Sequence, residues 1–160
     1  MQYSTPCKRM QRNGTFPRKM VWLSFTSLSL IYTIMLIGVY ITASDQGMSC
    51  PDWPLCPNGF GLPEPKYLFE HVHRMLVIIT SGFIFATALY AFKKAKSVQK
   101  TAIIASILVI IQMILGMILV NSKLLPILVA SHLATGMILF AMLLLTFIYS
   151  YRESNRTIKI

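Results

Sequence analysis

Four long apolar stretches dominate this sequence of 160 residues. They occupy residues 20–43, 67–92, 101–121 and 125–151. A helix needs about 20 mainly apolar residues to cross the roughly 30 Å hydrocarbon core of a bilayer, and each stretch reaches that length. The pattern therefore predicts an all-α integral membrane protein. Its four transmembrane helices would form an antiparallel bundle, with a polar loop over residues 44–66 between the first two.

Basic residues lie at the ends of these stretches and indicate their orientation. Five precede the first stretch, four lie between the second and third, and three follow the fourth, whereas the two opposite loops contain only Lys66 and Lys123. Lys and Arg are enriched on the cytoplasmic side of membrane proteins. Both termini are therefore predicted to be cytoplasmic, as basic tails over 1–19 and 152–160, and the loop over 44–66 to lie outside the cell membrane.

Composition excludes two other classes of protein. With 55% hydrophobic and 12% charged residues, the chain is too apolar for a soluble domain of this size. A net charge of +10 would suggest nucleic-acid binding in a soluble protein. Here the basic residues flank membrane spans, so the charge is explained by topology. We expect membrane lipid around the chain and no nucleic-acid partner.

Two histidines lie inside the predicted spans. His73 and His132 are each about two turns below the outer start of a span, which places both ~9–12 Å into the outer leaflet at 1.5 Å per residue. Ionisable side chains inside a bilayer are costly and mark function, and two imidazoles at equal depth can share one iron. Thr135 and Gly136 share the face of His132 and leave room for a flat macrocycle. The spacing favours ligation of a heme iron over the alternative, in which each histidine bonds a neighbouring helix.

Other charged residues surround His73. Glu70 lies three residues before His73 and four before Arg74, so the three share one helical face. One interpretation is a Glu70–Arg74 ion pair at the membrane surface. The other is a carboxylate held beside a metal or porphyrin edge, where it moves protons or stabilises positive charge, with Arg74 bound to a heme propionate. His71 points roughly 200° away from His73 and is interpreted as an interfacial residue, not as a ligand.

Cys50 and Cys56 lie in the polar loop, on the predicted outer side, where disulfides persist. A bond between them would close a short, rigid loop over the helix ends. The alternative is a metal site, but two cysteines supply only half of a zinc shell. Cys7, in the N-terminal tail, is predicted to be a free thiol.

Several motifs together resemble the heme A synthase family. The run G-M-S-C-P-D-W-P-L-C over residues 47–56, followed by Pro63 and by E-H-V-H-R over 70–74, is similar to that family's outer loop and second helix. Weaker similarities to its third and fourth helices involve Gln112, Gly116, Val120 and residues 130–132. The resemblance covers roughly residues 38–151. One departure is Ser44-Asp45-Gln46-Gly47, where the family usually has T-G-S-G.

The resemblance implies an enzyme. Heme A synthases oxidise one porphyrin methyl group of heme O to a formyl group, with oxygen from water, and so supply heme A to terminal oxidases. By this resemblance His73 and His132 are axial heme ligands, Glu70 is the catalytic carboxylate, and Cys50 and Cys56 form the loop disulfide. The implied cofactor is heme b with its iron, and the substrate is heme O. The implied partners are a heme O synthase that delivers heme O and an electron acceptor.

Family members commonly have eight helices in two similar halves, and this chain resembles one half, as some archaeal members do. A half-length chain would rebuild the full arrangement by pairing with a copy of itself, and two-fold pairing is the commonest oligomer symmetry. A homodimer is therefore expected. Two alternatives involve no catalysis: a bis-histidine b-type cytochrome, and a heme-handling protein of oxidase assembly. Glu70 and the cysteine loop favour the enzyme.

Overall fold

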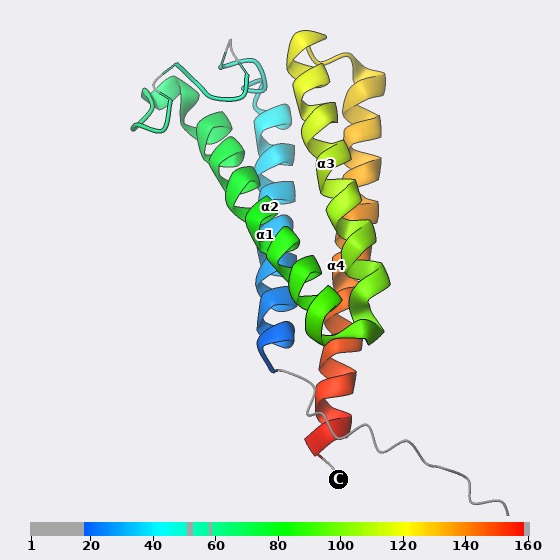
Figure 1. Cartoon of the computed structure of the whole chain (residues 1–160). Coiled ribbons are helices and arrows are strands. Elements are labelled where there is room, and N and C mark those ends of the chain that lie inside the picture. The colour runs from blue at the N-terminus through cyan, green and yellow to red at the C-terminus, as the bar shows by residue number, and fades with distance from the viewer. Residues whose placement is uncertain (1–17, 51–52, 58, 159–160) are drawn as a thin grey trace, which may run out of the picture.

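The computed structural model describes residues 18–50, 53–57 and 59–158, and the regular elements within them are helices (Figure 1). The long helices are α1 (Arg18–Ala43), α2 (Leu68–Lys94), α3 (Gln99–Asn121) and α4 (Pro126–Ile158). Two short 3-10 helices precede α2 and α3; they are η1 (Pro65–Tyr67) and η2 (Lys96–Val98). All four long helices are long and apolar enough to cross a membrane. The predicted all-α, multi-pass membrane fold is therefore confirmed.

The four helices run antiparallel, and each packs against two others, so that α4 returns to α1 (Figure 1). Helices α1 and α2 form one hairpin, and α3 and α4 form a second. The first described residue, Arg18, and the last, Ile158, lie at one end of the bundle, which we name the inner end. The opposite end, which carries the loop between α1 and α2, is the outer end.

The predicted boundaries of the spans agree closely with the helices, except at the end of α4. Helices α1, α2 and α3 begin and end within two residues of the predicted positions. Helix α4 is 33 residues long and continues to Ile158, through most of the predicted tail over 152–160, because no glycine or proline follows Gly136. Of the predicted N-terminal tail, residues 1–17 lie outside the described residues, and Arg18 and Lys19 belong to α1.

Side chains from all four helices fill the inner half of the bundle. A cluster of buried apolar residues contains Ile31, Ile84, Ala105, Val109, Leu139 and Leu143. Three pairs of hydroxyl groups lie within hydrogen-bond distance between helices: Ser24 and Ser150 at 3.0 Å, Ser27 and Thr87 at 3.2 Å, and Thr101 and Thr146 at 2.8 Å. Such contacts commonly join helices within a bilayer. The inner half is thus closed by packing, and the space for a ligand lies further out.

The loop between α1 and α2 folds over the outer end. Cys50 and Cys56 form the predicted disulfide, with Cα atoms 5.0 Å apart, and both are buried. Gly47 brings this loop against the turn between α3 and α4, because a Cβ at position 47 would stand 2.8 Å from Cδ1 of Leu124. The loop therefore contacts both hairpins. Cys7, the predicted free thiol, lies outside the described residues.

Candidate functional site

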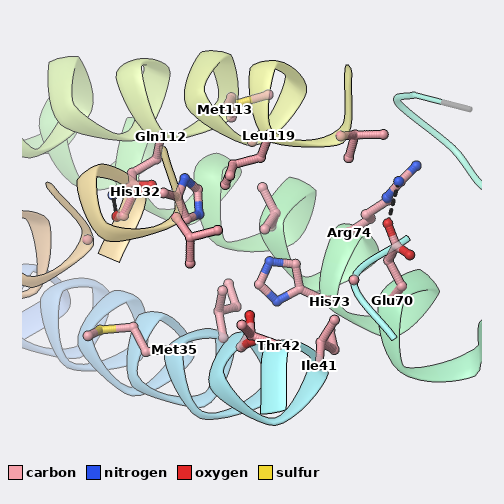
Figure 2. Close-up of a pocket in the computed structure, with 18 of the residues that line it drawn as sticks. Met35, Ile41, Thr42, Glu70, His73, Arg74, Gln112, Met113, Leu119 and His132 are labelled. Atoms are coloured by element: carbon pink, nitrogen blue, oxygen red, sulfur yellow. Dashed lines mark hydrogen bonds and ion pairs between the residues drawn. The ribbon is translucent and has the colours of Figure 1, made fainter. Parts of the chain in front are cut away.

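A cavity lies between the two hairpins in the outer half of the bundle (Figure 2). All four helices and the outer loop line it, mostly with aliphatic side chains. The few polar residues among those that line it are Thr42, Glu70, His73, Arg74, Gln112 and His132. An apolar cavity with a few placed polar groups is typical of a small-molecule site.

The structure brings the two predicted histidine ligands to this one cavity. His73 comes from α2 and His132 from α4, on opposite hairpins (Figure 2). His73 lies five residues after Leu68, the first residue of α2, and His132 lies six residues after Pro126, the first residue of α4. Their depths below the outer end are therefore nearly equal, as the sequence predicts.

Each imidazole packs against a glycine of the other helix in its own hairpin. A Cβ at Gly38 of α1 would stand 3.2 Å from Cε1 of His73, and a Cβ at Gly116 of α3 would stand 3.8 Å from Cε1 of His132. The first distance is closer than ordinary van der Waals contact, and the second is ordinary contact. Gly38 therefore makes room for the ring of His73, while the ring of His132 fits with less constraint.

The buried nitrogens of these rings are consistent with a ligand site. The Nδ1 atoms of His73 and His132 are both buried and have no hydrogen-bond partner among the described residues. Burial without a partner is unfavourable for a polar atom. The ring of His73 also contacts the backbone of Ile34 in the neighbouring helix α1. Imidazole is a common axial ligand of heme iron. Two imidazoles, aliphatic walls and a nearby guanidinium form a set of groups that fits an iron porphyrin.

Glu70 is held at the outer end of the cavity by three groups. It is 5% exposed. Its Oε1 accepts a hydrogen bond from Nη2 of Arg74 at 2.5 Å, and its Oε2 accepts bonds from Oγ of Ser49 at 2.8 Å and from the backbone N–H of Cys50 at 2.9 Å. Arg74 Nη2 also approaches the carbonyl of Cys50, at 3.5 Å. The carboxylate therefore links α2 to the disulfide loop, and it lines the cavity beside His73 (Figure 2).

The position of Glu70 combines features of its two interpretations, an ion pair with Arg74 and a carboxylate beside a porphyrin edge. The ion pair between Glu70 and Arg74 forms, but it is buried beneath the outer loop and does not lie exposed at a membrane surface. Charge-assisted bonds of this kind are among the stronger ones in proteins. The pair fixes the carboxylate and the guanidinium at the edge of the same cavity, and both groups line it.

His71, the third histidine, lies outside the cavity, which agrees with the interpretation that it is no ligand. However, it is only 6% exposed and its Nδ1 has no hydrogen-bond partner among the described residues. It is therefore a buried residue of the fold. Within the described part of the chain, no group of three His, Cys, Asp or Glu residues could hold a metal ion.

Sequence reasoning left several residues of the site without a role. Gln112 stands out in the sequence as the strongly polar residue in the middle of the third span, but only the structure shows that it contacts the turn of His132. Ser49 lies within the motif of the outer loop, yet its bond to Glu70 depends on how the loop folds back. Nothing in the sequence indicates a role for Gly38, because a glycine in an apolar helix does not reveal which neighbour it faces.

Comparisons with known proteins show which family the sequence resembles. A family model described as cytochrome oxidase assembly protein, COX15-CtaA, matches residues 60–159. The heme A synthase of Shewanella oneidensis is 29% identical over 149 residues, which cover 81% of this chain and 45% of that protein. The heme A synthase of Lysinibacillus sphaericus is 32% identical over 113 residues, which cover 67% of this chain and 37% of that protein. The heme A synthase of Geobacillus kaustophilus is 27% identical over 136 residues, which cover 80% of this chain and 42% of that protein.

These alignments take in less than half of each of the three heme A synthases. The family match, in contrast, takes in well over half of the 160 residues here, including the second, third and fourth helices. Both histidines, Glu70 and Arg74 lie inside the matched region. The chain therefore belongs to the COX15-CtaA family of cytochrome oxidase assembly proteins, in agreement with the resemblance found in its motifs.

Proposed function

We propose that this protein is a heme A synthase, which oxidises a methyl group of heme O to the formyl group of heme A for terminal oxidases. The observation that carries the proposal is the pair His73 and His132, which face one cavity from opposite hairpins. The similarity to heme A synthases supports the same reaction. In this proposal both histidines bind the porphyrin iron, as heme b when a resident heme is present and as heme O when the substrate is bound.

The remaining polar residues have roles that follow from their positions. Converting a methyl group and one water to a formyl group releases four protons and four electrons. Glu70 is the only carboxylate among the described residues that line the cavity, so it is our candidate for taking up protons from the attacking water. Arg74 supplies a positive charge at the outer edge, where it balances Glu70 and attracts a propionate. An electron acceptor outside the chain receives the electrons.

The proposed orientation places this cavity near the outer face of the cell membrane. Lys93, Lys94, Lys96, Arg152 and Arg156 lie at the inner end of the described helices, and basic residues favour the cytoplasmic side. The disulfide at the opposite end favours an oxidising compartment. We therefore propose that both termini are cytoplasmic, and that a heme O synthase delivers the substrate from within the same membrane.

Pigment extraction tests the function. The chain is expressed together with a heme O supply, and the extracted hemes are separated by chromatography. Heme A should appear with the wild type and disappear with His73→Ala or His132→Ala, while His71→Ala, which changes a histidine outside the cavity, should retain it. Heme O without heme A in the wild type would contradict the proposal.

A second candidate, a b-type cytochrome that only passes electrons, is favoured by the partners of Glu70. Arg74, Ser49 and Cys50 already occupy both oxygens of this carboxylate, as expected of a structural ion pair. A cytochrome would bind heme through His73 and His132 without forming heme A, and Glu70→Gln would leave its heme content nearly unchanged. The same extraction therefore separates the two candidates.

A further inference from the structure

Gln112 of α3 contacts the helical turn that carries His132. Its Nε2 donates hydrogen bonds to the backbone carbonyl of His132 and to Oγ1 of Thr135, both at 2.8 Å. The carbonyl can only accept, so the nitrogen side of the amide must face α4. The hydroxyl of Thr135 donates to carbonyls of its own helix, at Ser131 and His132, and is therefore free to accept from Gln112. The amide thus lies across a single turn of α4.

The two helices fit together reciprocally at this point. On α3, Gln112 and Gly116 are four residues apart, and on α4, His132 and Gly136 are four residues apart, so each pair shares one face. A Cβ at Gly136 would stand 3.2 Å from Nε2 of Gln112, and a Cβ at Gly116 would stand 3.8 Å from Cε1 of His132. Each glycine therefore accommodates the polar side chain of the facing helix. This reciprocal fit sets how α3 and α4 are aligned along their length.

Gln112 is the link between α3 and α4 in the outer half of the bundle. Within the described part of the chain, the other side-chain hydrogen bond between these helices joins Thr101 and Thr146. Thr101 lies eleven residues before Gln112, about 16 Å along α3 at 1.5 Å per residue. Among its described side chains, the second hairpin has no counterpart of the network of Glu70, Arg74 and the outer loop that holds α2 near His73. Near His132, the amide of Gln112 holds the helix in place instead.

We propose that Gln112 is the positioning residue of His132, which sets the height and rotation of this imidazole through the backbone of its own turn. The inference rests on the proposed function, in which His132 is an axial ligand. The two ligands are then held by different chemistry. A charged network, closed by the disulfide loop, holds the helix of His73, and a neutral amide holds the helix of His132.

Removal of the amide should change the heme and leave the fold intact. Gln112→Leu keeps a similar volume but loses both bonds to α4. Thr135→Val removes the hydroxyl that accepts from Gln112 and keeps the shape of the side chain, while Thr135→Ser keeps that hydroxyl. Thr101→Val is the matched control, because it breaks the other bond between the same two helices, at the inner end. Each full-length variant is purified in detergent and loaded with protoheme.

Three measurements follow: the electron paramagnetic resonance of the oxidised heme, its midpoint potential, and the rate at which heme is lost to an acceptor protein. For Gln112→Leu we expect shifted resonance and potential, and heme loss about tenfold faster, at the low end of the range for groups that orient metal ligands. Thr135→Val should shift all three in the same direction by a smaller amount, because the bond to the carbonyl of His132 remains. Thr135→Ser and Thr101→Val should resemble the wild type. The double variant of Gln112→Leu and Thr135→Val should be no worse than Gln112→Leu alone, because the one bond between the helices that Thr135→Val removes is already lost in Gln112→Leu.

Two results would overturn the inference, and they differ from each other. If Gln112→Leu and Thr135→Val match Thr101→Val in all three measurements, Gln112 only packs the helices together. If the heme spectrum of His132→Ala equals that of the wild type, His132 is no ligand. The proposed site then fails, and the role of Gln112 fails with it. Should Gln112→Leu not fold, Thr135→Val decides the question, since it leaves α3 unchanged.

Discussion

Gly38 of α1 and His73 of α2 are in closer contact than a side chain at position 38 would ordinarily allow. A Cβ there would stand 3.2 Å from Cε1 of the imidazole, so the ring or the helix would have to move by a few tenths of an ångström. The ring of His73 also lines the cavity between the hairpins. The position of one candidate heme ligand therefore depends on the absence of a side chain in the neighbouring helix.

This contact predicts the effect of Gly38→Ala. In most helices a change from glycine to alanine is stabilising, by up to about 1 kcal/mol. Here the added methyl group should displace His73, so that heme binding weakens or its absorption spectrum changes although the helix itself is favoured. Absorption spectra and heme content of the purified protein measure the effect.

Two other glycines are matched controls for Gly38→Ala. A Cβ at Gly82 would have no neighbour within 4 Å, and one at Gly116 would lie 3.8 Å from His132. Gly82→Ala should leave the spectrum unchanged, and Gly116→Ala should have a smaller effect than Gly38→Ala. Equal spectra for Gly38→Ala and Gly82→Ala would show that His73 does not need this space.

A second prediction concerns the charge of Glu70. Glu70→Gln should fold and retain heme, because an amide oxygen can still accept from Ser49 and from the backbone of Cys50. It should lose heme A production by at least about 100-fold, the lower limit for a positioned acid–base group, since an amide cannot exchange a proton as a carboxylate does. Chromatography of the extracted hemes measures the yield.

Glu64→Gln is the control for this change, because Glu64 is exposed and pairs with Lys66 at 3.9 Å, away from the cavity. It should make heme A as the wild type does. A wild-type yield from Glu70→Gln would leave Glu70 with the structural role of an ion-pair partner for Arg74.

A third prediction concerns the disulfide. Its bond closes a short loop, so the loss of chain entropy that it provides is worth only about 2 kcal/mol. Cys50→Ser should therefore fold, but its looser loop should weaken the bonds that Cys50 and Ser49 make to Glu70. Heme A yield should fall more than thermal stability does, whereas Cys7→Ser should change neither. Peptide mass mapping without reductant should find Cys50 linked to Cys56 and Cys7 alkylated; an alkylated Cys50 would contradict the bond.

The homodimer stays a prediction that mass measurement in detergent can test. Because the basic loops orient every copy in the same way, two copies would lie parallel in the membrane, each with its own pair of histidines. We expect a particle of twice the chain mass after correction for bound detergent and lipid. A monomer with full heme A yield would show that one four-helix unit handles the substrate alone.

The sequence by itself determined the membrane spans and the depth of the candidate ligands. Both follow from local properties. A run of apolar residues predicts a helix that crosses the bilayer, and the distance of His73 and His132 from the starts of their spans sets how deep they lie. The end of α4 at Ile158 was missed because apolarity stops at Tyr151, whereas helix formation continues until a residue interrupts it.

Only the tertiary structure decided which faces of the helices meet. In a soluble helix the apolar stripe reveals the buried face, but in a bilayer lipid is as apolar as the protein core, and α1 and α3 carry apolar residues around most of their circumference. Their rotation therefore cannot be read from the sequence. The contacts of Gly38 with His73, of Gln112 with the turn of His132, and of Ser49 with Glu70 all depend on that rotation or on the path of the outer loop.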